Sequence, residues 1–139
     1  MPVARLSRKI FFNASRTLWR RDWSKEKNLA TYGEETPHGY GHNYALEVEV
    51  EGAVDAEKGM VVNLSDLDRL LREEVDRPLD HRNLNLEVSE FSAVPPTFEN
   101  LAAWIWRRVT ARLAREGWPC RLTRLVLRPS PDVAVEIDR

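Results

Sequence analysis

The chain has 139 residues, of which 42% are hydrophobic and 31% are charged, and its formal net charge is −1. This length predicts one domain, residues 1–139, large enough to bury a core. The near-neutral charge excludes a global field that attracts nucleic acid or a membrane surface, and there is no apolar run of the roughly 20 residues that a membrane span needs. One cysteine excludes an internal disulfide framework. With no signal-peptide pattern either, we expect a cytoplasmic protein.

Apolar and alternating segments predict the strands. The first is expected over residues 3–15, around an apolar centre, and the second over residues 42–50, where apolar and polar residues alternate. Residues 60–63 are expected to return as a short strand that forms a hairpin with the second. Residues 120–127 and 133–137 are expected to form the last two strands.

Two helices are predicted between these strands, after a long polar loop over residues 19–37. Ser65 is expected to cap the first helix and Pro78 to end it. The second helix is expected to begin at Thr97 and to close at Gly117. Runs of strands on either side of two helices indicate an α+β fold with an antiparallel sheet.

Five short motifs, taken together, resemble one known family. In chain order they are Phe12-Asn13-Ala14-Ser15, Tyr40-Gly41-His42-Asn43-Tyr44, Gly59-Met60-Val61-Val62-Asn63-Leu64, Leu79-Asp80-His81 with Asn83-Leu84, and Thr97-Phe98-Glu99-Asn100. Their order and spacing resemble the 6-pyruvoyl-tetrahydropterin synthase and 6-carboxytetrahydropterin synthase family. The resemblance implies a T-fold (tunnelling fold), in which a four-stranded antiparallel sheet carries two helices on one face. It also implies a homo-oligomer, trimer or hexamer, with active sites between subunits.

The same resemblance implies a zinc site, which family members build from three histidines in the first two motifs. In this chain Arg16 and Tyr40 stand at two of those positions and only His42 remains. An arginine repels a cation and one imidazole does not make a zinc site, so we expect no cofactor. The alternative is a rearranged metal site formed by His38, His42 and His81.

Proton transfer is assigned by the resemblance to Asp80 and His81, with the aspartate orienting the imidazole. The alternative is that this pair only satisfies backbone groups in a turn. The family's catalytic cysteine has no counterpart here, and one subgroup of the family uses a glutamate instead. Glu34 or Glu35 is the candidate for that general base, against the alternative that this pair is solvated surface.

The candidate ligand-binding residues are Arg16, His42, Thr97, Glu99 and Arg128. Glu99 matches a family glutamate near the pterin, although a glutamate in the first turn also stabilises a helix. Arg128 aligns with the carboxylate that anchors the pterin ring in the family, and an arginine offers only hydrogen-bond donors. Arg16 and Arg128 are therefore expected to face an anion, with salt bridging at the surface or an interface as the alternative.

These residues leave two functions open. The resemblance implies a carbon–oxygen lyase of the pterin or 7-deazapurine pathway, acting on a dihydroneopterin triphosphate-like substrate with altered, zinc-independent chemistry. The alternative is a diverged T-fold protein, either non-catalytic or repurposed, that binds an anionic small molecule. In both cases the expected partners are a small molecule, pterin-like or anionic, and further copies of the chain, with no nucleic acid and no membrane.

Overall fold

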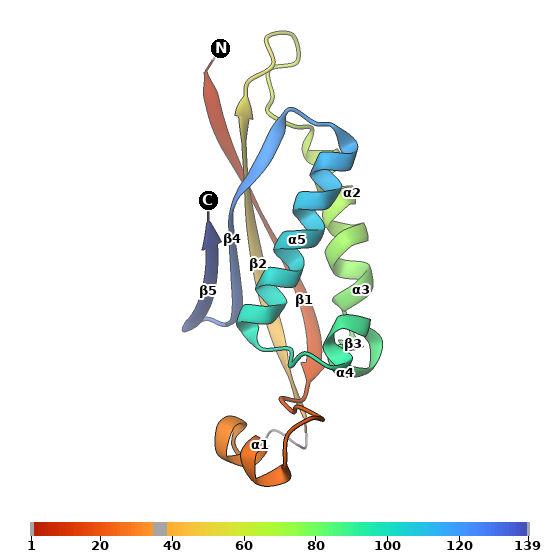
Figure 1. Cartoon of the computed structure of the whole chain (residues 1–139). Helices are drawn as coiled ribbons and strands as arrows, with labels where there is room; N and C mark the ends of the chain where they lie inside the picture. Colours follow the sequence, from red (N-terminus) through yellow and green to blue (C-terminus); the bar gives the residue numbers. More distant parts are fainter. Residues whose placement is uncertain (1, 35–38, 139) are drawn as a thin grey trace.

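The computed structural model describes residues 2–34 and 39–138 and contains one sheet that is covered by helices on one face (Figure 1). The sheet order is β3-β1-β2-β4-β5. Its strands are β1 (Val3–Arg16), β2 (Tyr40–Ala53), β3 (Arg82–Asn83), β4 (Cys120–Ser130) and β5 (Val133–Asp138). The expected four-stranded antiparallel sheet is present, and the two-residue strand β3 adds a short parallel pairing to the edge of β1.

The helical segments lie mainly between β2 and β4. They are α1 (Lys25–Tyr32), α2 (Leu64–Leu71), the π-helical turn η2 (Arg72–Asp76), α3 (Arg77–Leu79), α4 (Leu84–Glu87), the 3-10 turn η3 (Ser89–Ser92) and α5 (Phe98–Glu116). Figure 1 shows α5 beside α2 and α3 on one face of the sheet, with α1 beyond one end of it. Within the described residues, no helix is both long and apolar enough to cross a membrane.

The core lies between this helical layer and the even-numbered residues of β1 and β2. These two strands pair in register from Val3 opposite Ala53 to Arg16 opposite Tyr40. Side chains alternate between the two faces of a strand, so buried residues such as Leu46 point to the helices and the odd-numbered residues point away from them.

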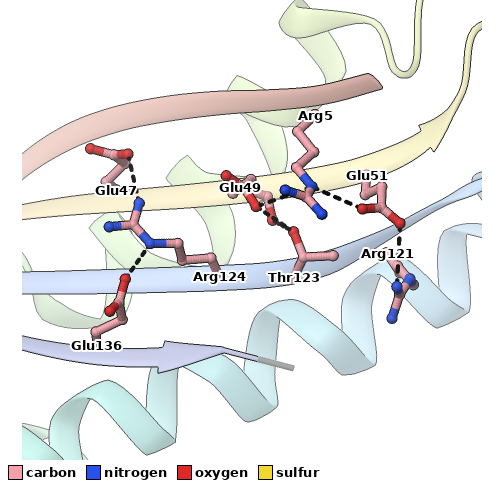
Figure 2. Close-up of polar contacts among 8 residues, drawn as sticks. All are labelled: Arg5, Glu47, Glu49, Glu51, Arg121, Thr123, Arg124 and Glu136. Carbon is pink, nitrogen blue, oxygen red and sulfur yellow. Dashed lines mark hydrogen bonds and ion pairs between the residues drawn. The ribbon is translucent and has the colours of Figure 1, made fainter. Parts of the chain in front are cut away.

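The face without helices carries charged side chains that bond across the strands (Figure 2). Arg5 Nε donates to Glu51 Oε2 at 2.9 Å, and Arg121 Nη2 donates to Glu51 Oε1 at 3.2 Å. Arg124 Nη1 donates to Glu47 Oε2 at 3.3 Å. One face of an antiparallel sheet can be exposed to solvent, and these charged pairs make that face polar.

Two predicted helix boundaries were wrong. Asn63, not Ser65, caps α2, because its side-chain oxygen accepts from the Ser65 N–H at 2.9 Å. Pro78 does not end the helical segment but lies within α3. Proline has no N–H, so the carbonyl of Glu74 lacks the partner that residue 78 normally supplies. Arg108 Nε of α5 donates to that carbonyl at 3.0 Å and so replaces the missing bond.

The predicted strand over residues 60–63 is absent. β2 lies between β1 and β4, so both of its edges are already paired and no hairpin partner can add to it. A turn forms instead, in which the Gly59 N–H donates to Asp55 O at 2.8 Å and the Asp55 N–H donates to Met60 O at 3.1 Å. Gly59 has a φ of 73°, a conformation that glycine adopts without strain.

The predicted loop over residues 19–37 contains α1. Ser24 caps this helix through its hydroxyl oxygen. The fully buried Asn28 accepts from the Arg20 N–H at 2.8 Å and donates to the carbonyls of Arg20 and Ser24 at 2.9 and 3.0 Å. This one side chain therefore folds the preceding segment onto the helix. Residues 35–38 lie outside the described part.

Candidate functional site

Asp80 and His81 follow α3 and are anchored to β1 at Asn13. The Asn13 N–H donates to Asp80 Oδ1 at 2.9 Å, and the His81 N–H donates to the Asn13 carbonyl at 2.6 Å. The His81 Nδ1 atom lies 3.0 Å from Asp80 Oδ2. His81 has a φ of 60°, which is uncommon for a residue other than glycine and is often found at functional sites. The backbone thus holds an aspartate–histidine pair whose imidazole side chain is 76% exposed.

The electrostatics of the pair favour an ionised aspartate. Burial raises the pKa of the Asp80 carboxyl, but hydrogen bonds from the Asn13 N–H and from His81 outweigh this effect and place the pKa below its usual value. A carboxylate accepts a hydrogen bond from Nδ1–H of an imidazole. This contact fixes the ring and leaves Nε2 of His81 for exchange of a proton with a ligand.

A cavity of about 570 Å³ lies beside the pair, within the size range of small-molecule sites. Its polar lining comes from the ends of β1 and β2 and from the β3 region: Asn13, Ser15, His42, Asn43, His81, Arg82, Asn83 and Glu87. Arg82 Nη1 lies 3.3 Å from Glu87 Oε1, and the Asn83 N–H donates to Glu87 Oε2 at 2.7 Å. The cavity therefore presents amide, hydroxyl, imidazole and paired ionic groups to a polar ligand.

A second cluster lies on the helix-covered face, at the same end of the sheet. Arg16 is only 4% exposed, and its Nη1 donates to the Pro96 carbonyl at 2.9 Å. Its Cζ lies 3.9 Å from the ring centroid of Phe98 and 5.9 Å from that of Tyr40. The ring of Phe98 in turn meets His42 edge to face, with centroids 5.1 Å apart. Arg16 therefore ties the end of the sheet to the start of α5.

This cluster is desolvated and lacks several hydrogen-bond partners. Burial lowers the pKa of Arg16 from its usual value, while burial and the nearby Arg16 charge lower the pKa of His42. Burial raises the pKa of Tyr44 to about 12. The Nε of Arg16, Nε2 of His42 and hydroxyl of Tyr44 are buried without a hydrogen-bond partner among the described residues.

A zinc ion does not fit this donor set. Arg16 and Tyr40 occupy positions that face His42, and the guanidinium places a positive charge where a metal ion requires lone pairs. In the part of the chain that the structure describes, no three His, Cys, Asp or Glu side chains are grouped to hold a metal ion. His38, proposed with His42 and His81 as the alternative, lies outside the described residues.

Comparison with known proteins decides the family. The family model described as 6-pyruvoyl tetrahydropterin synthase matches residues 5–139. This chain belongs to that family. It is 44% identical over 104 residues to 6-pyruvoyl tetrahydrobiopterin synthase of Homo sapiens, covering 74% of this chain and 72% of the relative. It is 35% identical over 105 residues to dihydroneopterin monophosphate aldolase of Pyrococcus furiosus, covering 76% of this chain and 82% of the relative.

The fold of the family is confirmed by a solved structure. The 6-pyruvoyl tetrahydropterin synthase of Caenorhabditis elegans superimposes with a TM-score of 0.89 at 27% identity, covering 100% of this chain and 97% of that one. A Plasmodium vivax 6-pyruvoyl tetrahydropterin synthase aligns with a TM-score of 0.69 at 16% identity, covering 100% of this chain and 99% of that one, and shows the shared fold alone. The predicted T-fold is therefore correct for this member of the 6-pyruvoyl tetrahydropterin synthase family.

Some predicted ligand-binding residues of this family member are close together. Arg16 and His42 lie in the buried cluster, and Thr97 lies at its edge as the cap of α5, where its hydroxyl accepts from the Asn100 N–H at 3.0 Å. Glu99 lies in the first turn of α5 and interacts electrostatically with Arg16. The N-terminus of α5 therefore meets the end of the sheet at this cluster.

Other predicted residues lie elsewhere in the single chain. Arg128 is opposite Ala45 on β4, is exposed, and is not among the residues that line the cavity. Glu34 is exposed after α1, and Glu35 lies outside the described residues. The sequence prediction missed Tyr44, although the period of two along β2 places it on the same side as His42. It also missed Asn43, which lines the cavity from the opposite side of that strand.

Proposed function

We propose that this chain is a pterin-pathway lyase of its family that transfers protons through Asp80 and His81 and works without zinc. The observation that carries the proposal is the preserved pair, with Nδ1 of His81 3.0 Å from Asp80 Oδ2, beside a polar cavity. The names of the human and Pyrococcus relatives, a 6-pyruvoyl tetrahydrobiopterin synthase and a dihydroneopterin monophosphate aldolase, support a pterin compound as the substrate.

The chemistry assigned to the pair is general acid–base catalysis. The ionised Asp80 holds Nδ1–H of His81, and Nε2 accepts a proton from the substrate and returns it. In a carbon–oxygen lyase this proton leaves a carbon atom, and the electron pair that remains expels a phosphate-bearing oxygen. Such positioned proton transfer contributes typically about 10²–10⁴-fold to a rate. Glu34 or Glu35 is proposed as the second proton carrier, on the strength of the family resemblance.

Assembly of copies is part of the proposal. β5 pairs only with β4, and β1 pairs on its outer side only with the two residues of β3, so the described sheet has two largely open edges. Open edges expose unpaired backbone groups that proteins normally cover. A homo-oligomer, trimer or hexamer, covers both edges by joining them between subunits.

The alternative function is binding of an anionic small molecule without catalysis. Arg16 favours it, because among the described residues this buried guanidinium forms no salt bridge and donates only to the neutral Pro96 carbonyl, at 2.9 Å. A buried charge without a partner is costly, and the anionic group of a ligand removes that cost. Arg128, which is exposed on the face without helices, offers a second cation.

The test follows conversion of dihydroneopterin triphosphate by release of inorganic triphosphate and by product chromatography, in protein that has been dialysed against a chelator. We expect turnover by the wild-type chain and a loss of about 10²-fold or more in Asp80→Asn and His81→Gln. Asp66→Asn is the matched control, because Asp66 is a half-buried acid on α2 whose salt bridge among the described residues is to Arg69, at 3.3 Å. Turnover that depends on added zinc contradicts the zinc-free mechanism. Tight anion binding without turnover favours the alternative.

A further inference from the structure

The charge of Arg16 is retained in a place where a charge is costly. The residue is 4% exposed, and its close contacts are the Pro96 carbonyl and the rings of Phe98 and Tyr40. Glu99 attracts this charge without forming a salt bridge among the described residues. Burying a charge that lacks a salt-bridge partner costs free energy, and a guanidinium does not escape this cost by losing its proton. The site therefore holds a permanent cation whose presence packing alone does not explain.

The backbone around this cation is spaced as a three-ligand site. Arg16 and Tyr40 are directly opposite in the β1–β2 register, and His42 lies two residues beyond Tyr40 on the same face. The ring centroids of Tyr40 and His42 are 5.6 Å apart. Two imidazoles bound at about 2.1 Å to one tetrahedral metal ion place their centroids about 5 Å apart. Positions 40 and 42 thus have a spacing that suits two imidazoles on one metal ion, and position 16, directly opposite position 40, carries a guanidinium whose Cζ lies 5.9 Å from the Tyr40 ring centroid.

We propose that Arg16 is a cation supplied by the protein in the place of a metal ion, and that Arg16→His combined with Tyr40→His converts the cluster into a zinc site. The proposal rests on the zinc-free part of the proposed function. The bond from Arg16 to the Pro96 carbonyl gives the cation a structural role like that of a metal, since it joins the end of β1 to the segment that leads into α5. The unpartnered Nε–H of Arg16 and the hydroxyl of Tyr44 remain as donors toward an oxygen of a ligand.

The test measures metal content and stability rather than activity. The wild-type chain, Tyr40→His and Arg16→His/Tyr40→His are stripped with a chelator, incubated with ZnCl₂ and desalted before elemental analysis. We expect about one zinc per chain only in the double variant, whose thermal midpoint then rises with zinc concentration because binding stabilises the folded state. Arg16→Lys is a control, since it keeps a cation and is expected to take up no zinc.

Tyr40→His provides a second test if the double variant does not fold. This single variant places two imidazoles at positions 40 and 42, but Arg16 still fills the site, so we expect it to take up no zinc. Zinc at one per chain in the wild type or in Tyr40→His overturns the proposal. So does a folded double variant without zinc. Lyase activity of the wild-type chain is measured in a separate assay. If that activity is absent while the zinc contents are as expected, the proposed function is refuted and the proposal about Arg16 is still supported.

Discussion

Glu74→Gln is expected to lower the free energy of unfolding by about 2–3 kcal/mol, because this carboxylate joins the helix that leads to Asp80 with α5. Glu74 is buried, and its carboxylate oxygens contact three arginines of α5. The distances are 2.8 Å to Arg108 Nη2, 3.2 Å to Arg112 Nη1 and 3.4 Å to Arg115 Nη2. The glutamine keeps the shape and one acceptor but loses the charge.

The magnitude follows from the exposure of each partner. The side chains of Glu74 and Arg112 are 11% and 15% exposed, so their pair is largely desolvated. Breaking a buried pair costs about 3–5 kcal/mol, and we assign roughly half of this to a substitution that retains an acceptor. Arg108 and Arg115 are 37% and 64% exposed. Exposed pairs contribute about 0.2–1 kcal/mol, so these two arginines add little.

Thermal and urea unfolding at one fixed protein concentration measure the effect, since an oligomer makes stability depend on concentration. A chain of this size loses about 3–5 °C of Tm per kcal/mol, so Glu74→Gln is expected to lower Tm by about 6–15 °C. The matched control is Glu116→Gln. Among the described residues Glu116 forms one salt bridge, 2.8 Å to Arg112 Nε, and its side chain is 30% exposed. Such an i,i+4 pair contributes about 0.3–0.5 kcal/mol. Equal decreases in Tm for the two variants refute the reasoning. Salt at 1 M shortens the Debye length to about 3 Å and screens exposed pairs, but it screens buried pairs weakly. A decrease in Tm for Glu74→Gln that disappears in 1 M salt therefore also refutes it.

Three further predictions concern single positions. The lowered pKa of Asp80 means that its ionised form adds stability above the unfolded pKa near 3.8 and loses it as the pH falls through the folded value, so urea titrations should show the deficit of Asp80→Asn shrinking between pH 6 and pH 3. Gly52→Ala should destabilise the β2–β4 end by about 1–3 kcal/mol, because the new Cβ meets the Pro119 carbonyl oxygen at 2.5 Å; Gly59→Ala, whose Cβ meets no atom but whose φ of 73° strains a side chain, gives the size of a purely conformational cost in the same melting assay. Asn28→Ala should cost about 2–3 kcal/mol locally, seen as faster amide hydrogen exchange over residues 20–32, and unchanged exchange there contradicts the role of this side chain.

The sequence predicted the strands well where burial alternates and less well where neighbouring elements decide the structure. β1 was predicted to end at Ser15 and ends at Arg16, because its alternation continues to the end. The apolar run of residues 60–63 was wrongly predicted to be a strand, since hydrophobicity does not show whether a neighbouring strand has a free edge. Helix α1 was missed because it depends on the buried contacts of Asn28, which its local pattern does not reveal.

The candidate site was predicted in part for a related reason. Asp80 and His81 are adjacent in sequence, so their motif was enough to predict a local pair. Arg16 and Arg128 were both expected to face the ligand, but Arg16 lies on the helix-covered face and Arg128 is exposed. Relating distant strands requires their register, and a shift between Glu49 and Val50 changes the pairing of β2 with β4. No pattern within one strand predicts that shift.

The π-helical turn η2 has a consequence for how the helix orients the proton-transfer pair. An α-helix advances by about 100° per residue, and a π-turn accommodates one extra residue in a turn. Everything after residues 72–76 is therefore rotated by roughly that angle relative to an uninterrupted helix. Leu79 enters the core and Asp80 reaches Asn13 in this rotated phase. The number of residues between Asn63 and Asp80 thus determines the rotation of the helix at Asp80. Removing one residue there changes the direction in which the Asp80 carboxylate points, and does not merely shorten the helix.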